Sequence, residues 1–210
     1  MDIGHKYIVS EKHKFICYEI MKSCTGTLRG YFIINPAEKY EAFQISGKTK
    51  PQSIIDYENK KYFKFAFVRN PWARIVSCWL NKIYYYKIPG KPQATGIVHK
   101  ELTPDTTFEE FVNFIYKTPD DIADCHFRSI HKSIPRKDIF IGKAESFDKD
   151  FKTIISTLGL TLHSIKRRNT TYDKNDTKPW KEYYTPDLVN KISERYKEDI
   201  MLYKYSFENG

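Results

Sequence analysis

The chain has 210 residues, with 35 lysines and arginines against 26 acidic residues and a formal net charge of +9 at pH 7. This length suits one domain, residues 1–210, and the apolar runs are too short for a membrane span or a signal peptide. The positive charge suits a nucleotide, an anionic glycan, nucleic acid or an anionic membrane. The chain has four cysteines, Cys17, Cys24, Cys78 and Cys125, and their spacing matches no zinc site. We expect them to be reduced thiols, with a disulfide as the open alternative.

A loop of small residues follows the first predicted strand, which covers residues 14–20. Small side chains let backbone N–H groups close around an anion, Lys22 adds a mobile positive charge, and two threonine hydroxyls add donors. The loop is not a Walker A motif, in which the lysine comes last, next to the magnesium-binding hydroxyl. Taken alone, the pattern also fits an ordinary turn. The residues that we expect to hold an anion are Lys22, Ser23, Cys24, Thr25, Gly26 and Thr27.

A second predicted anion site lies where a buried strand, residues 62–68, turns into a helix. Asn70 can cap this helix and Pro71 suits its first position. Apolar residues at helical spacing form one face, namely Ile75, Val76, Trp79, Leu80 and Ile83. The opposite face, which we expect to be exposed, carries Asn70, Ala73, Arg74 and Ser77. With Arg69 at the strand end, these groups and the helix N-terminus favour a phosphate site, unless Arg69 merely pairs with a surface carboxylate.

Helix and strand signals alternate along the rest of the chain. In order, they are a capping box at Thr107–Glu110, a short apolar strand at 139–141, an apolar stripe over 147–158 that ends at Gly159, and a last helix from Thr185 and Pro186 to Tyr203. A loop without periodicity, residues 84–104, is expected to cover the site. The alternation predicts an α/β fold with a central, mainly parallel sheet, helices on both faces and ligands at the carboxyl ends of the strands.

Taken together, the two anion sites resemble those of sulfotransferases that use 3′-phosphoadenosine 5′-phosphosulfate (PAPS). In these enzymes an R-x-x-x-x-x-x-x-S element binds the 3′-phosphate, and Arg69 and Ser77 have this spacing within F-V-R-N-P-W-A-R-I-V-S. Their 5′-phosphosulfate loop has the form P-K-x-G-[ST]-[ST]. This chain keeps Lys22, Thr25 and Thr27, and it departs from the pattern at Met21, Cys24 and Gly26.

Three later segments resemble the carbohydrate sulfotransferases, a family that includes chondroitin and HNK-1-type enzymes and bacterial relatives. Residues 124–128, D-C-H-F-R, are similar to the D-x-H-[FW]-R segment of these enzymes. Residues 139–147 are similar to a later strand and turn, and residues 183–200 to the final helix. The resemblance implies a P-loop-like, three-layer α/β fold that binds PAPS, releases the nucleotide product PAP and needs no metal.

The resemblance also implies a role for each matching residue. Lys22 would contact the bridging oxygen and the 5′-phosphate, the rest of its loop would hold the phosphosulfate, and Arg69 and Ser77 would hold the 3′-phosphate. Arg168 belongs to a basic cluster before the last helix, and in relatives a C-terminal loop of this kind closes over the nucleotide. Arg168 is therefore a candidate for the 3′-phosphate, with a solvated basic turn as the open alternative.

The acceptor hydroxyl needs a general base, and His126 is the first candidate because imidazole titrates near neutral pH. A structural or acceptor-binding role for His126 stays open. Glu41 and Glu38 are alternatives, since some glycan sulfotransferases place their base just after the first helix. Glu19 ends the first predicted strand and could also reach the site, although such a residue is often paired with a neighbouring cation.

Two other functions stay open at this point. A P-loop-like nucleotide kinase is disfavoured by the missing G-K-[ST] sequence, and a nucleic-acid-binding module by the absence of a known motif. We expect the acceptor to be a carbohydrate or another small molecule with a hydroxyl, and not nucleic acid. Golgi enzymes of this kind usually carry an N-terminal anchor, so the short N-terminus predicts a cytoplasmic, bacterial enzyme or a trimmed Golgi one.

Overall fold

A computed structural model of the chain describes residues 4–34, 40–47, 52–87, 99–166 and 177–209. These residues form two compact units that exchange segments along the sequence. The sheet unit contains the described residues of Gly4–Arg69 and Ser133–Asn169, and the helical unit contains those of Asn70–Lys132 and Thr170–Gly210. A single domain over the whole chain stays a prediction.

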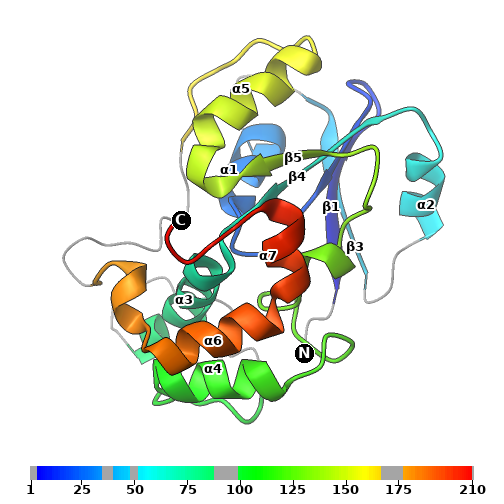
Figure 1. Cartoon of the computed structure of the whole chain (residues 1–210). Coiled ribbons are helices and arrows are strands. Elements are labelled where there is room, and N and C mark those ends of the chain that lie inside the picture. Colours follow the sequence, from blue (N-terminus) through cyan, green and yellow to red (C-terminus); the bar gives the residue numbers. More distant parts are fainter. Residues whose placement is uncertain (1–3, 35–39, 48–51, 88–98, 167–176, 210) are drawn as a thin grey trace. The chain divides into compact units, whose positions relative to one another are not determined.

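One five-stranded sheet forms the centre of the sheet unit, in the order β3-β1-β2-β4-β5 (Figure 1). The pairs β2–β4 and β4–β5 are parallel, whereas β1 runs antiparallel to both β2 and β3. Since β2 and β3 both oppose β1, four of the five strands point the same way, and the predicted α/β class with a mainly parallel sheet is confirmed. The strands are β1 (His5–Ser10), β2 (Phe15–Tyr18), β3 (Ala42–Gly47), β4 (Phe63–Val68) and β5 (Phe140–Lys143).

The sequence did not reveal β1 and β3, and the strand expected first, over residues 14–20, is the second strand of a hairpin. Lys14 has a left-handed backbone, with φ of 51°, and forms part of the hairpin turn, which shortens β2 to four residues. The edge strand β3 leaves Phe43 exposed and carries no buried residue, so it lacks the apolar run that marks a covered strand.

Aromatic rings cover one face of this sheet. They join the strands to the π-helical turn Gly30–Ile34 and to α5 (Phe147–Thr157), and Leu28 of α1 (Thr25–Arg29) belongs to the same cluster. The ring centroids of Phe15 and Phe32 are 4.9 Å apart, and each such buried side chain contributes about 1.5–3 kcal/mol. Residue 142 is a glycine for a steric reason, because the Cβ of any other residue at this position would lie 2.7 Å from Cε1 of Phe67. The buried phenylalanines of this cluster are Phe15, Phe32, Phe65, Phe67, Phe147 and Phe151.

Local signals set the helix ends as predicted. The Asn70 side chain accepts from the N–H of Trp72 at 3.1 Å, and Thr107 and Glu110 form the predicted capping box. Thr185 caps the later helix, and Gly159, with φ of 64°, follows α5. The remaining helices are α2 (Gln52–Glu58), α3 (Pro71–Lys82), α4 (Phe108–Lys117), α6 (Pro186–Arg195) and α7 (Lys197–Tyr203). Short 3₁₀ turns lie at Tyr84–Lys87, Ile130–Lys132, Ala144–Ser146 and Trp180–Tyr183.

The last helix, predicted as continuous to Tyr203, is broken at Tyr196 into α6 and α7. Tyr196 is fully buried, leaves the helical conformation with φ of −112° and ψ of 26°, and donates its hydroxyl to the carbonyl of Phe127. The tertiary hydrogen bond accompanies the break, and no glycine or proline marks it in the sequence. None of the described helices is long and apolar enough to cross a membrane.

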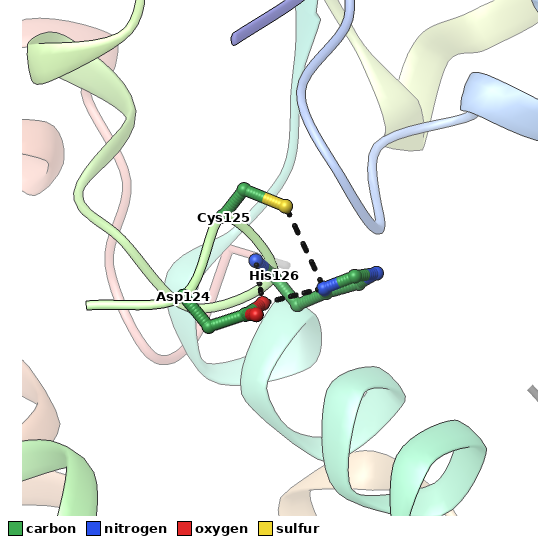
Figure 2. A group of neighbouring side chains, drawn as sticks. All are labelled: Asp124, Cys125 and His126. Carbon is green, nitrogen blue, oxygen red and sulfur yellow. Dashed lines mark hydrogen bonds and ion pairs between the residues drawn. The ribbon is translucent and has the colours of Figure 1, made fainter. Parts of the chain in front are cut away.

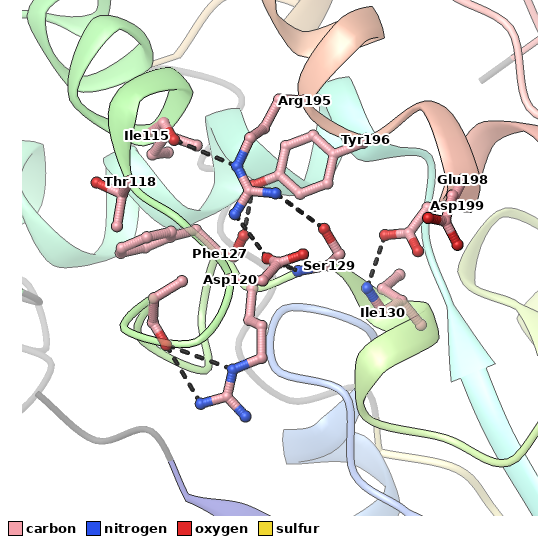
Figure 3. A network of polar contacts seen from close by, with 12 residues as sticks. Ile115, Thr118, Asp120, Phe127, Ser129, Ile130, Arg195, Tyr196, Glu198 and Asp199 are labelled. Atoms are coloured by element: carbon pink, nitrogen blue, oxygen red, sulfur yellow. Dashed lines mark hydrogen bonds and ion pairs between the residues drawn. The ribbon is translucent and has the colours of Figure 1, made fainter.

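Two acidic side chains tie residues 120–131 to α6 and α7 (Figure 3). Asp120 accepts from Arg195 at 2.6 Å and from the backbone N–H of Ser129 at 3.0 Å. The fully buried Asp199 accepts from the N–H of Ile130 at 2.6 Å and from Nδ1 of His131 at 2.7 Å. Irregular backbone in this segment is therefore held by side chains rather than by a regular ladder.

The Asp120–Arg195 pair predicts a pH-dependent stability. Burial alone would raise the pKa of Asp120, but the hydrogen bonds from Arg195 and Ser129 outweigh it and lower this pKa below its ordinary value of 3.8. The ionised Asp120 therefore stabilises the folded state at pH values above 3.8, and this stabilisation is lost as the pH falls through the lowered pKa of Asp120. Asp120→Asn should lower the free energy of unfolding by about 2 kcal/mol near neutral pH.

Urea titrations over a pH series measure this difference. The gap between wild type and Asp120→Asn should narrow as the pH falls below 3.8, while the neighbouring exposed Asp121→Asn should show little gap throughout. A gap that is independent of pH would contradict the assignment.

Candidate functional site

The turn between β2 and α1 contains two left-handed residues, and we call residues 20–28, which are this turn and most of α1, the anion loop after the role that the sequence predicts for it. Lys22 has φ of 68° and Cys24 has φ of 65°, while the N–H of Ser23 donates to the carbonyl of Ile20 at 3.0 Å. Left-handed backbone costs a non-glycine residue roughly 1–2 kcal/mol and gathers at functional sites. The predicted departure from the family pattern at Cys24 is thus accommodated by strained backbone at the start of α1.

Ser23 adds a second unusual feature to the anion loop. Its side chain is fully buried, and its Oγ has no hydrogen-bond partner among the described residues. Buried hydroxyls nearly always have a partner, so an orphan in a native structure calls for an explanation. A ligand anion or a change of loop conformation on binding would supply one.

The parallel pairing of β2 and β4 brings the predicted cations together. Both strands end at the same edge of the sheet, so Lys22 and Arg69 follow neighbouring strand ends. One guanidinium nitrogen of Arg69 donates to the carbonyl oxygen of Lys22 at 3.3 Å. Arg69 therefore holds the backbone of the anion loop and adds its charge beside it.

Glu19, which precedes the anion loop, forms an ion pair with Arg29, which follows it. The side chain of Glu19 is fully buried and accepts from Nε of Arg29 at 2.6 Å, from Nη2 of the same arginine at 3.2 Å, and from the amide of Gln44. Since Glu19 precedes the loop and Arg29 ends α1, this pair joins the two ends of the loop. Of the alternative bases, Glu19 is thus engaged in an ion pair, as one reading of the sequence expected.

The structure gives less support to a role as base for the other two alternatives, Glu41 and Glu38. Glu41 is exposed and pairs with Lys12 at 2.8 Å. Glu38 lies outside the described residues, as does Arg168.

The face of α3 that was expected to be exposed is buried, and this prediction was wrong. Arg74 is 2% exposed and Ser77 1% exposed. The guanidinium of Arg74 donates to the carbonyl oxygens of Arg128 at 2.8 Å and Cys125 at 3.4 Å. Arg74 therefore binds backbone of the later segment instead of facing water. An amphipathic pattern cannot reveal such a partner, because a polar residue on a helix face ordinarily faces water.

His126 lies in a turn whose acidic residue fixes the imidazole (Figure 2). Oδ1 of Asp124 lies 2.6 Å from Nδ1 of His126 and also accepts from the backbone N–H of His126 at 2.9 Å. The Asp124 side chain is 4% exposed and that of His126 15% exposed. A carboxylate at Nδ1 favours the tautomer that carries its proton there, which leaves Nε2 free of a proton in the neutral ring.

Asp124, Cys125 and His126 also offer three metal-ligand atoms within 4.8 Å of one another. Two ligands of a tetrahedral zinc ion lie about 3.3 Å apart, which is wider than the 2.6 Å between Oδ1 of Asp124 and Nδ1 of His126. The Sγ of Cys125 is 3.6 Å from the same nitrogen. The spacing fits a shared proton better than a metal ion.

The structure therefore groups the predicted residues in two sets. Lys22 and Arg69 meet in the sheet unit, while Ser77 and His126 belong to the helical unit. That the two sets act on one ligand stays a prediction. Sequence reasoning allowed for a cation beside Glu19 but did not identify Arg29, since ten positions separate these residues and no periodicity links them.

Comparison with known proteins gives one family and several relatives. The sequence profile described as the sulfotransferase family matches residues 5–206. Carbohydrate sulfotransferase 14 of Danio rerio is 24% identical over 229 residues, which cover 96% of this chain and 62% of that protein. Carbohydrate sulfotransferase 11 of Mus musculus is 25% identical over 244 residues, covering 99% of this chain and 69% of that protein. No solved structure gives a significant match.

The ion pair below the anion loop leads to a stability prediction. Arg29→Met would leave the buried carboxylate of Glu19 without its cation, and we expect a loss of about 2 kcal/mol, discounted because the Arg29 side chain is 33% exposed. Lys12→Met is the matched control, since Lys12 and Glu41 form an exposed pair that should contribute less than about 1 kcal/mol. Equal losses in the two variants, measured by urea unfolding, would argue against the pair.

Proposed function

The chain belongs to the sulfotransferase family, and from this premise we propose that it transfers a sulfuryl group from PAPS to a hydroxyl of a carbohydrate acceptor. The observation that carries the proposal is the contact of Arg69 with the backbone of Lys22 in a strained anion loop at the carboxyl edge of the sheet. The relatives are named as carbohydrate sulfotransferases, which supports a glycan acceptor.

The proposed reaction is an in-line displacement at sulfur. The acceptor oxygen forms a new S–O bond while the S–O bond to the 5′-phosphate of PAPS breaks. PAP leaves with the electron pair of the broken bond, and a base takes the hydroxyl proton. Such a reaction depends mainly on positioning and on stabilising the charge that develops on the leaving oxygen, so we propose that it needs no metal.

Lys22 is proposed to bind the bridging oxygen and the 5′-phosphate. Its left-handed backbone and that of Cys24 support the role, because such turns direct N–H groups toward an anion. The orphaned hydroxyl of Ser23 is a further donor within the same loop. We assign the phosphosulfate to this loop, with the remaining residues Thr25, Gly26 and Thr27.

Arg69 is proposed to bind the 3′-phosphate together with Ser77. Arg69 is partly buried and follows β4 directly, so its guanidinium is held at the strand end. Ser77 is assigned on the resemblance alone, since it is buried in the structure. The same holds for Arg168, which lies outside the described residues.

His126 is proposed as the general base. The hydrogen bond from Nδ1 to Asp124 supports this assignment, since it orients the ring and stabilises the imidazolium that forms when Nε2 takes a proton. The family match favours neither the kinase nor the nucleic-acid alternative. The reported relatives come from a fish and a mouse, so a bacterial source and a cytoplasmic location stay predictions.

PAP binding tests the nucleotide half of the proposal. At one hundred times its dissociation constant, PAP should raise the melting temperature by about 5 °C or more in the presence of EDTA, because binding to the folded state contributes about 2.7 kcal/mol. Lys22→Ala and Arg69→Ala should each remove most of this shift.

Arg136→Ala is the matched control, since Arg136 is an exposed arginine of the same unit. It should keep the shift. Absence of any shift in the wild-type protein at saturating PAP would overturn the proposal, as would a shift that requires magnesium.

The general base can be tested separately from nucleotide binding. His126→Asn should lower kcat by about 10²–10⁴-fold while the melting shift with PAP is kept. Asp124→Asn should give a smaller loss, because the ring remains but loses its orienting carboxylate. His13→Asn, in the hairpin turn between β1 and β2, should leave kcat unchanged. A His126→Asn enzyme with full activity would assign the proton to another group.

A further inference from the structure

Arg74 is a buried cation that donates to backbone carbonyls. It is 2% exposed, in the first turn of α3, and its guanidinium donates to the carbonyl oxygens of Arg128 at 2.8 Å and Cys125 at 3.4 Å. A buried guanidinium is costly unless its donors are satisfied. The two carbonyls flank His126 on either side in the sequence.

The turn around His126 has almost all of its carbonyls satisfied. The carbonyl of Asp124 accepts from two backbone N–H groups, those of Phe127 and Arg128, at 3.1 and 2.9 Å. Side chains donate hydrogen bonds to the other carbonyls. The Arg128 side chain donates to the carbonyl of Ala123 at 3.2 Å, Arg74 donates to those of Cys125 and Arg128, and the Tyr196 hydroxyl donates to that of Phe127. An irregular turn with this many fixed carbonyls is held in one conformation.

Arg74 also shares a helix face with Ser77, because residues three apart on a helix lie side by side. One face of α3 therefore carries both a residue proposed for the 3′-phosphate and the anchor of the turn that presents His126. A lysine would not reproduce this anchor, since its single ammonium lacks the planar fork that reaches two carbonyls at once.

We propose that Arg74 is a positioning residue, which fixes the turn of residues 123–128 on α3 and so sets the place of His126 relative to Ser77. The proposal rests on the function proposed above for these two residues. It replaces the role in anion binding that the sequence predicted for Arg74. A displacement of a catalytic group by about 1 Å costs on the order of 10²-fold in rate, so loosening the turn should be visible in kcat.

The experiment compares Arg74→Lys with Trp79→Phe. Trp79 lies on the same helix and also donates to a backbone carbonyl, that of Thr106 at 3.0 Å, but this carbonyl is outside the turn. Arg74→Lys should lower kcat by about 10- to 100-fold with little change in the melting shift with PAP. Trp79→Phe should change neither.

A second readout does not depend on activity. Cys125 lies in the turn and is partly exposed, so its alkylation rate, followed by peptide mass spectrometry, reports how often the turn opens. Arg74→Lys should raise this rate by about fivefold or more, and Trp79→Phe should not. If Arg74→Lys fails to fold, Arg74→Gln keeps an amide donor on the same helix face and should raise the same rate, and an unchanged rate in that variant would overturn the positioning role.

The two readouts separate the possible failures. Unchanged kcat and unchanged alkylation in Arg74→Lys would overturn the positioning role, as would a loss of kcat that only follows the loss of folded protein. If the wild-type enzyme transfers no sulfuryl group and binds no PAP, the proposed function fails instead. The anchoring of the turn by Arg74 is then decided by the alkylation rate alone.

Discussion

The proposed nucleotide site depends on the parallel pairing of β2 with β4. Parallel neighbours end at the same edge, so the residues that follow them meet whatever the side chains are. Here those residues lead to Lys22 and Arg69, and the hydrogen bond between the Arg69 guanidinium and the Lys22 carbonyl joins them.

Backbone carbonyls held by buried side chains are the second recurring feature. Arg74, Arg128 and Tyr196 together fix the turn that presents His126, and Asp120 and Asp199 hold the N–H groups that follow it. These contacts replace a regular hydrogen-bond ladder in a segment without strand or α-helix. Removing one of them leaves a buried polar group unpaired, which costs more than the bond itself contributes.

The parts of the fold that the sequence predicted are those encoded locally. Asn70, Thr107 and Gly159 act on backbone within a few residues, and the buried run of β4 needs no partner to be recognised. The missed features depend on distant partners instead. The exposed edge strand β3 exists through its pairing with β1, and the break at Tyr196 accompanies a hydrogen bond to Phe127.

The candidate site divides in the same way. The spacing of Arg69 and Ser77 and the lysine of the anion loop were visible as motifs. The Glu19–Arg29 pair and the anchoring role of Arg74 were not, because each joins residues whose spacing in sequence carries no pattern. The most direct test of the account is transfer of labelled sulfate from PAPS to a glycan panel that includes chondroitin, with EDTA present. The wild-type enzyme should give labelled glycan and PAP in equal amounts, and Lys22→Met should give neither. Equal transfer by both enzymes, or no transfer to any glycan, would contradict the proposed function.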